Sequence, residues 1–135
     1  MLGLPIQQKI FAAIHPVDFR KGIDGLCGIV RERFSKNPMD GTIFVFRNRM
    51  GNTLKILFYD GGGFWLCQKR FSRGRIRFWP EAEHSHNASM HTKKTVEPAG
   101  VHKIYAPELT LLIHQMKKNQ AVGYKPFFIP QQNKA

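Results

Sequence analysis

The chain has 135 residues, of which 42% are hydrophobic, and its 21 lysines and arginines against 9 acids give a formal net charge of +12. This length fits one domain with a hydrophobic core, and the composition excludes disorder throughout the chain. The sequence also lacks the run of about 18 apolar residues that a membrane span needs, and its positive charge makes nucleic acid the leading class of partner.

The N-terminal segment Met1–Ile14 lacks the pattern of a secretory signal, because it has neither a basic start with a long apolar run nor a small-residue cleavage site. We therefore expect a soluble protein in the cytoplasm, a reducing compartment. Cys27 falls on the apolar face of a predicted helix, and Cys67 falls in an aromatic strand. Both cysteines are expected to be buried free thiols.

The first predicted elements are a short strand within Lys9–Ile14 and an amphipathic helix of about four turns that Asp18 caps at its N-terminus. The helix is predicted from apolar residues that recur at three- and four-residue spacing on one face: Ile23, Leu26, Cys27, Val30 and Phe34. Phe34 closes the helix, and the cluster Ser35–Gly41 breaks the pattern into a loop.

Two cations, Arg20 and Lys21, fall in the first turn of this predicted helix, where unpaired amide groups already create positive charge. Two explanations remain open. Arg20 can pair with Asp24 one turn further on, which stabilises a helix slightly. Alternatively, the start of the helix binds a phosphate group, which would balance the local charge.

Four β-branched and aromatic runs follow, and they predict the strands Thr42–Arg47, Thr53–Tyr59, Phe64–Phe71 and Arg75–Trp79. Turn residues separate them at Asn48–Asn52, Asp60–Gly63 and Ser72–Gly74. Because connections this short join antiparallel neighbours, the four strands predict an antiparallel meander.

The chain becomes polar over Glu81–Gly100, which is predicted to be an extended loop. A second helix is predicted to begin near Pro107 and to dock on the sheet through one apolar stripe, which consists of Leu109, Leu112, Ile113 and Met116. Two lysines, Lys117 and Lys118, follow at the C-terminal end of this helix. We therefore predict the fold class α/β, of the α+β type: a single compact domain over residues 1–120, with two main helices packed on an antiparallel meander sheet of four or five strands. Residues 121–135 are predicted to form an extended C-terminal tail.

The predicted sheet is strongly basic, because Asp60 is the only acid between residues 41 and 80. Alternation along the last strand places Arg75 and Arg77 on one face. Such a surface binds phosphates with an affinity that depends steeply on salt and weakly on base sequence, and a merely solvated face is the alternative. The candidate nucleic-acid-binding residues are Arg20, Lys21, Arg47, Arg49, Lys69, Arg70, Arg73, Arg75 and Arg77.

Aromatic side chains on this sheet could stack unpaired bases, but Trp65, Phe71 and Trp79 are interpreted first as packing residues, because strand aromatics ordinarily fill volume. The run Asp60–Gly63 shares only its glycines with phosphate-cradling loops, since it lacks both the Lys-Ser/Thr ending and a following helix. It is therefore predicted to be a tight turn.

No catalytic or metal site is predicted. Three histidines, His84, His86 and His91, lie beside Glu81 and Glu83, but their spacing matches no recognised zinc pattern, and a polar loop is the preferred interpretation. A two-metal nuclease needs converging carboxylates, whereas the acids here are scattered along the chain. We therefore expect no enzyme activity and no cofactor.

Several separated motifs resemble those of one family: Asp18-Phe19-Arg20-Lys21-Gly22, Asp24-Gly25-Leu26, Phe44-Val45-Phe46, Lys55-Ile56-Leu57, Asp60-Gly61, Lys69-Arg70-Phe71 and an Arg-Phe-Trp-Pro ending at Pro80. From about Lys9 to Pro80 the chain resembles the small, TnpB-like accessory protein that the second reading frame of the insertion-sequence-66 group encodes. The resemblance implies a protein that assists transposition of a bacterial mobile element beside a separate, larger transposase. It supplies no catalytic residues.

We therefore predict a non-catalytic nucleic-acid-binding accessory protein whose partners are DNA and the transposase of the element, with no membrane partner. One alternative is an interaction module that binds the transposase through its basic residues and does not contact DNA. A metal-dependent nuclease is a third interpretation, which the missing carboxylate cluster disfavours. Strandedness, the choice between DNA and RNA, and oligomeric state stay open at this stage.

Overall fold

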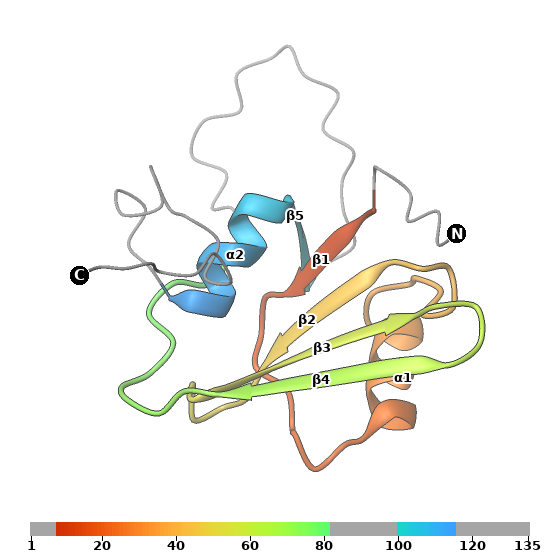
Figure 1. The fold of residues 1–135 in the computed structure, drawn as a ribbon. Helices are drawn as coiled ribbons and strands as arrows, with labels where there is room; N and C mark the ends of the chain where they lie inside the picture. The colour runs from red at the N-terminus through yellow and green to blue at the C-terminus, as the bar shows by residue number, and fades with distance from the viewer. Residues whose placement is uncertain (1–7, 82–99, 116–135) are drawn as a thin grey trace, which may run out of the picture.

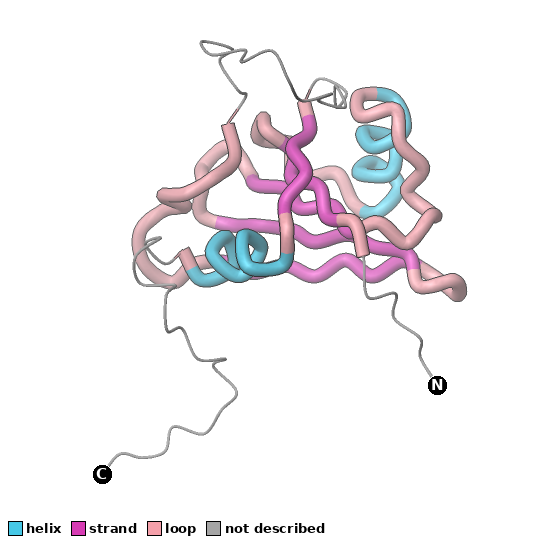
Figure 2. The backbone as a smooth tube through the Cα atoms, turned by 90° about the horizontal axis from the view of Figure 1, so that it is seen from above, coloured by secondary structure: helices cyan, strands magenta, loops and turns pink. Residues whose placement is uncertain are grey.

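Five strands form one mixed sheet with a helix on each face (Figures 1 and 2). The structure is a computed structural model that describes residues 8–81 and 100–115. Its elements in chain order are β1 (Ile10–Ala13), α1 (Ile23–Glu32), β2 (Ile43–Arg47), β3 (Thr53–Tyr59), β4 (Phe64–Arg70), β5 (Val101–Ile104) and α2 (Ala106–His114). The predicted α+β class with two helices packed on a sheet is confirmed.

The strands lie in the order β4-β3-β2-β1-β5. The antiparallel meander is confirmed for β2, β3 and β4, but β1 runs parallel to β2, with Phe11 opposite Phe44. Parallel neighbours need a long crossover, and α1 lies in the one that joins β1 to β2. The edge strand β5 was not predicted, and it pairs antiparallel to β1, with Ile104 opposite Ile10.

Side chains alternate across the sheet and build a separate core on each face. On the α1 face, Phe11, Phe44 and Phe46 are buried against Leu26 and Val30 of α1, as the predicted apolar helix face requires. The core cluster of the α2 face includes Ile10, Ala12, Val45, Ile104 and Leu112. The second helix thus docks as predicted, with Pro107 in its first turn.

The N-terminus of α1 differs from the prediction. The helix begins at Ile23 with Gly22 as the N-cap, and no side chain caps it, so the prediction that Asp18 is the cap was wrong. Instead, the carboxylate of Asp18 accepts a hydrogen bond from the backbone N–H of Arg20 at 2.9 Å and forms a short turn before the helix. Arg20 and Lys21 therefore precede α1 rather than occupy its first turn.

Residues 71–80 were predicted to contain a fourth strand of the meander, Arg75–Trp79, and this was wrong. The segment pairs with no strand; its backbone N–H groups find other acceptors. Ile76 donates to the carbonyl oxygen of Gly51 at 2.6 Å, and Phe78 donates to the side chain of Gln115 at 2.9 Å. These partners replace a strand ladder, but Arg75 and Arg77 are still exposed, while Ile76 and Phe78 are half-buried.

The two cysteines are free, as predicted, but only one is buried. Cys27 lies in the core of the α1 face, and burial raises the pKa of its thiol. Cys67 on β4 is exposed, so the prediction that it is buried was wrong. No helix among the described residues is long and apolar enough to cross a membrane.

Several predictions fall outside the described residues. They concern most of the Glu81–Gly100 loop, the lysines after α2 and the tail over residues 121–135. The last apolar position of the predicted helix stripe, Met116, also lies there.

Candidate nucleic-acid interface

Three segments come together at the end of the sheet where β2 and β4 end and β3 begins. The loop before α1 is joined to β2 by a bond from the Val17 N–H to the Arg47 carbonyl oxygen at 3.0 Å. The segment after β4 is joined to the β2–β3 turn by a bond from the Phe71 N–H to the Asn52 carbonyl oxygen at 2.8 Å. Residues far apart in the sequence therefore share one end of the molecule.

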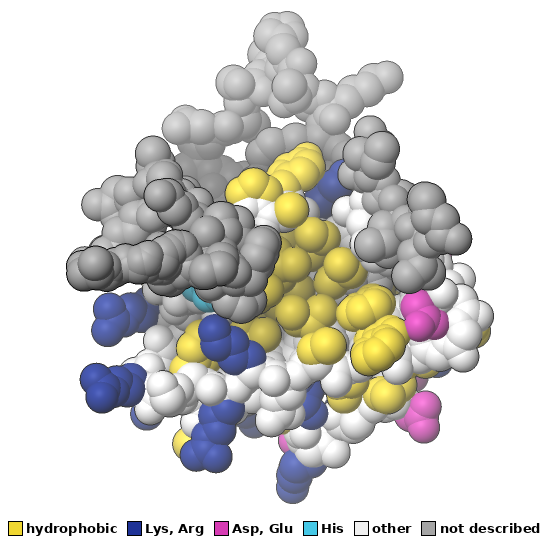
Figure 3. Space-filling model, viewed as in Figure 1, with side chains coloured by type: hydrophobic (Ala, Val, Ile, Leu, Met, Phe, Trp, Pro, Cys, Tyr) yellow, Lys and Arg dark blue, Asp and Glu magenta, His cyan; other side chains and the backbone are white. Residues whose placement is uncertain are grey.

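Seven of the nine predicted cations are exposed on these three segments or at the adjoining end of β4. We call this group the basic rim, and it consists of Arg20, Lys21, Arg49, Arg70, Arg73, Arg75 and Arg77. Figure 3 shows lysines and arginines along the left and lower margins of the α2 face, near the end of β4, whereas acidic side chains lie on the right. Charge is thus segregated along the sheet, with Asp60 in the turn at the opposite end of the β3–β4 hairpin.

The remaining two candidates, Arg47 and Lys69, are half-buried and bind main-chain oxygens of this chain. Arg47 donates to the carbonyl of Ile14 at 2.8 Å, and its guanidinium lies 5.4 Å from the ring centroid of Trp79. Burial lowers its pKa. Lys69 donates to the carbonyl of Ile113, near the C-terminal end of α2, at 2.8 Å. Both side chains hold the fold together, so they offer less charge to a ligand than the basic rim does.

One acid, Asp18, lies within the basic rim. Arg20 Nε donates to both of its carboxylate oxygens at 3.1 Å, and Arg20 Nη2 donates to Oδ2 at 2.8 Å. These bonds, with a smaller contribution from Arg49, lower the pKa of Asp18 to about 2. Arg20 therefore pairs with Asp18 and not with Asp24, the pairing that was one of the two explanations left open. Since the Arg20 side chain is 91% exposed, this pair leaves it accessible to solvent.

A shallow cleft of about 520 Å³ opens beside this ion pair. Its charged walls are Arg20, Arg49 and the carboxylate of Asp18, and its apolar surface comes from Val17, Phe19 and Met50. Met50 is 65% exposed. Charged groups beside apolar surface suit a sugar-phosphate backbone, which carries both anionic and less polar parts. Sequence reasoning missed this cleft, because its two walls are joined only by the pairing of Val17 with the β2–β3 turn.

The two tryptophans have different surroundings. Trp79 packs against the core of the α2 face, and its Nε1 donates to the carbonyl of Ala13 at 2.7 Å, which confirms its predicted packing role. Trp65 stacks on Phe58 on the sheet face, yet it remains 55% exposed. Its Nε1 donates to Asp60 at 2.8 Å.

The run Asp60–Gly63 is a tight turn, as predicted. The Asp60 carboxylate accepts hydrogen bonds from the N–H groups of Gly62 and Gly63 at 2.8 and 2.9 Å, and these bonds lower its pKa. Gly61 has φ +95°, a conformation that favours glycine. Because the turn amides already bind a carboxylate, they do not form a phosphate cradle.

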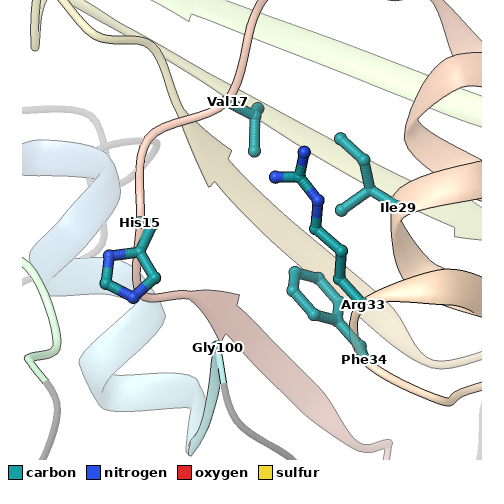
Figure 4. Close-up of a pocket in the computed structure, with 6 residues that line it drawn as sticks. All are labelled: His15, Val17, Ile29, Arg33, Phe34 and Gly100. Carbon is teal, nitrogen blue, oxygen red and sulfur yellow. The ribbon is translucent and has the colours of Figure 1, made fainter.

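A second cleft, of about 180 Å³, lies on the α1 side of the sheet (Figure 4). The Arg33 side chain crosses it between Val17 and Ile29, while His15 and Gly100 lie across from Phe34. Small-molecule sites commonly occupy about 300 Å³ or more, so this cleft does not suggest a substrate pocket.

No group of three or more metal-ligating side chains occurs within residues 8–81 and 100–115. The three histidines considered for a metal, His84, His86 and His91, lie outside that range.

Comparison with known proteins matches a family model described as IS66 Orf2 like protein over residues 8–98. Two uncharacterized proteins of Sinorhizobium fredii are also similar. The first, y4hO, is 43% identical over 75 residues, which are 56% of this chain and 64% of that protein. The second, y4jC, is 36% identical over 80 residues, 59% of this chain and 68% of that protein. The chain thus spans about two thirds of each relative, and no solved structure matches it.

Proposed function

The chain belongs to the IS66 Orf2-like family, and from this premise we propose that it is a non-catalytic nucleic-acid-binding accessory protein that assists transposition of a bacterial insertion sequence. The basic rim holds the phosphate backbone of DNA. A separate transposase encoded by the element performs the strand chemistry.

One observation carries this proposal: seven exposed cations from three chain segments share one end of the sheet, and Asp18 is the acid among them. Each cation that meets a phosphate releases a condensed counterion, which gives affinity without base contacts. The net charge of +12 adds long-range attraction for the same polymer. We therefore expect binding that tolerates changes of base sequence and weakens steeply with salt.

The test measures the affinity of purified protein for duplex and single-stranded DNA across a salt series. A rim variant replaces Arg49, Arg73 and Arg75 with Gln. If each cation meets one phosphate, the slope of log affinity against log salt falls by roughly two to three in magnitude, at about 0.9 for each phosphate contact on duplex DNA.

A matched control replaces three exposed cations outside the rim, Lys9, Arg31 and Lys103, with Gln and removes the same net charge. We expect this control variant to keep nearly the same slope of log affinity against log salt as the parent protein. Equal losses in the two triple variants would mean that bulk charge, rather than the rim, attracts DNA, and the site assignment would fail.

The same protein is then tested for retention by the transposase of its element. If neither form of DNA binds at low salt while the transposase retains the protein, the rim serves an acidic protein surface instead. That result would replace the nucleic-acid proposal with the interaction-module alternative.

A further inference from the structure

The strand β4 forms one edge of the sheet, and no described strand pairs with its outer side. Two hydrogen bonds fix which way its backbone faces: the Phe71 N–H binds the Asn52 carbonyl, and the Asp60 N–H binds the Gly63 carbonyl. Antiparallel pairs alternate between bonded and non-bonded positions, so odd-numbered residues of β4 bind β3. The even-numbered residues Phe64, Leu66, Gln68 and Arg70 therefore direct their N–H and C=O groups away from the sheet.

Over most of its length, from Phe64 to Gln68, this edge lacks the usual protection against pairing with another strand. Natural edges carry charges, prolines or bulges, whereas the run from Phe64 to Gln68 has no charge, proline or glycine. On the α2 face, Trp65 is 55% exposed, and Cys67 is exposed beside it. Half-buried Ile56 lies opposite Cys67 on β3, and Figure 3 shows an apolar patch over this part of the face.

We propose that β4 pairs with β4 of a second copy of this chain, antiparallel about a twofold axis at Cys67. The two five-stranded sheets then form one ten-stranded sheet. Leu66 and Gln68 exchange backbone hydrogen bonds with Gln68 and Leu66 of the second copy. This interface forms without DNA and so does not depend on the nucleic-acid proposal, but Arg70 at the end of β4 belongs both to the paired strand and to the basic rim.

The strand complements itself in this register, which is why the second copy is the occupant. It begins with the aromatic residues Phe64 and Trp65 and ends with the cations Lys69 and Arg70. Antiparallel pairing about Cys67 places each cation opposite an aromatic ring of the other copy, a favourable arrangement. Parallel pairing would place like charges side by side. A twofold axis at Leu66 would place the cations opposite the glycine turn.

The proposal also places the two Cys67 residues opposite each other. On the outer edge of β4, Cys67 is a non-bonded position, where directly opposed Cα atoms lie about 4.5 Å apart. That separation falls within the range that a disulfide spans. Cys27 is buried, so it does not compete for a mild thiol reagent.

The test first measures molar mass by sedimentation across a range of protein concentrations, without DNA. We expect a reversible dimer. Diamide is then added: two Cys67 thiols form one disulfide, and diamide takes up the two protons and two electrons to become the hydrazine. The expected product is a covalent dimer that forms in the Cys27→Ala variant and is lost in Cys67→Ser, while Cys67→Ser still dimerises without the oxidant.

A backbone variant tests the edge itself. Gln68→Pro removes an N–H that faces outward, so it costs no hydrogen bond within the chain but blocks the pairing with the second copy. We expect a monomer with an unchanged circular dichroism spectrum, whereas the control Gln68→Thr keeps the N–H and the dimer. If the proline variant fails to fold, Trp65→Lys supplies a second test. It places a like charge opposite Lys69 of the second copy at two symmetric positions, and the dissociation constant should rise roughly tenfold.

Several results would overturn the proposal. They are a wild-type protein that stays monomeric at all concentrations, a folded Gln68→Pro variant that dimerises like the parent, and the absence of a Cys67 cross-link in a proven dimer. Association with the transposase alone, and not with a second copy, would also overturn it.

Discussion

Several polar side chains of this sheet bind main-chain carbonyl oxygens far away in the sequence. Besides Arg47 and Lys69, the buried Lys55 donates to the carbonyl of Phe19 at 3.0 Å and lies 4.8 Å from that residue's ring centroid. Trp79 donates to Ala13 in the same way. These bonds attach irregular segments to strands, so some of the positive charge in the sequence is structural.

Trp79 provides a test of this structural role. Trp79→Phe keeps an aromatic ring but leaves the Ala13 carbonyl without its donor, so the free energy of unfolding should fall by about 1–2 kcal/mol in urea denaturation. The control Trp65→Phe loses only an exposed bond to Asp60 and should change stability by less than about 0.5 kcal/mol. DNA affinity of the folded Trp79→Phe protein should match the parent; a large loss would assign Trp79 to the ligand surface.

The carboxyl group of Asp18 reports on the ion pair in the basic rim. Its pKa of about 2 should be observed by NMR titration, and Arg20→Gln should bring it back toward 3.8. Because the folded-state pKa is lowered, the group stabilises the protein above the unfolded-state pKa. That contribution declines as pH falls from about 4 to about 2.

Asp18→Asn should therefore lower stability at neutral pH, and the difference from the parent should disappear as the pH falls through and below about 2. An unshifted Asp18 pKa in the parent protein would contradict the observed pairing with Arg20.

At the scale of elements, the sequence patterns correctly predicted the helices and hairpins that depend on interactions between residues close together in the chain. The spacing of Leu26 and Val30 predicted a helix, and alternating runs with short turns predicted the hairpins of β2, β3 and β4. The helix start was misplaced, because Asp18 binds the backbone of Arg20 two residues on instead of capping α1. A short polar side chain such as that of Asp18 can cap a helix or accept a hydrogen bond from a nearby backbone N–H in a turn. Which of the two it does depends on the backbone conformation of the residues that follow.

Long-range partners explain the remaining errors. The parallel pairing of β1 with β2 and the four-residue strand β5 depend on contacts between distant segments, which leave little local signal. The position of the basic rim also depends on contacts between distant segments. Its cations could be identified from the sequence, but their gathering at one end depends on the Val17 and Phe71 backbone bonds. Arg47 and Arg49 have the same charge, and only the fold separates the half-buried one from the exposed one.

The segment after β4 depends on Gln115, the residue that ends α2. Its Oε1 accepts from the N–H groups of Arg77 and Phe78 at 2.6 and 2.9 Å, and its Nε2 donates to the carbonyl of Phe78 at 3.2 Å. The residue also has φ 53°, a left-handed conformation that costs roughly 1–2 kcal/mol outside glycine.

Gln115→Ala should therefore lower the free energy of unfolding by about 1–3 kcal/mol, because it loses the bonds and keeps the strain. Gln115→Gly loses the same bonds but relieves the backbone, so it should be about 1 kcal/mol more stable than the alanine variant. Both should speed tryptic cleavage between residues 71 and 80. Unchanged cleavage in both variants would show that Gln115 does not hold this segment.

At the scale of the whole molecule, the two helices cover the sheet unequally. On the α2 face, the buried core involves β1, β2, β5 and Leu112, while Trp65 and Cys67 of β4 stay exposed. The basic rim and the exposed edge of β4 therefore belong to the same half of the molecule. In the proposed dimer the antiparallel strands place the two rims at opposite ends of the shared sheet, so that one assembly offers two separate candidate sites for phosphate.

The net charge of +12 also predicts how salt acts on stability. Like charges crowded on a folded surface repel one another, and unfolding relieves the repulsion. Raising NaCl from about 10 mM to about 150 mM shortens the screening length from ~30 Å to ~8 Å. The melting temperature should therefore rise by a few degrees, which corresponds to about 1 kcal/mol.

The triple variant of Arg49, Arg73 and Arg75 distinguishes repulsion within the basic rim from repulsion spread over the whole surface. Its melting temperature is measured by calorimetry at the same two NaCl concentrations. The variant removes three neighbouring cations that form no ion pair with another described residue, so it should melt above the parent at low salt and respond less to added NaCl. Replacing Lys9, Arg31 and Lys103 removes equal charge from scattered positions and should raise the melting temperature less. A melting temperature that falls with salt in the parent would mean that attractive pairs dominate, and the crowded basic rim would not be a source of strain in the folded state.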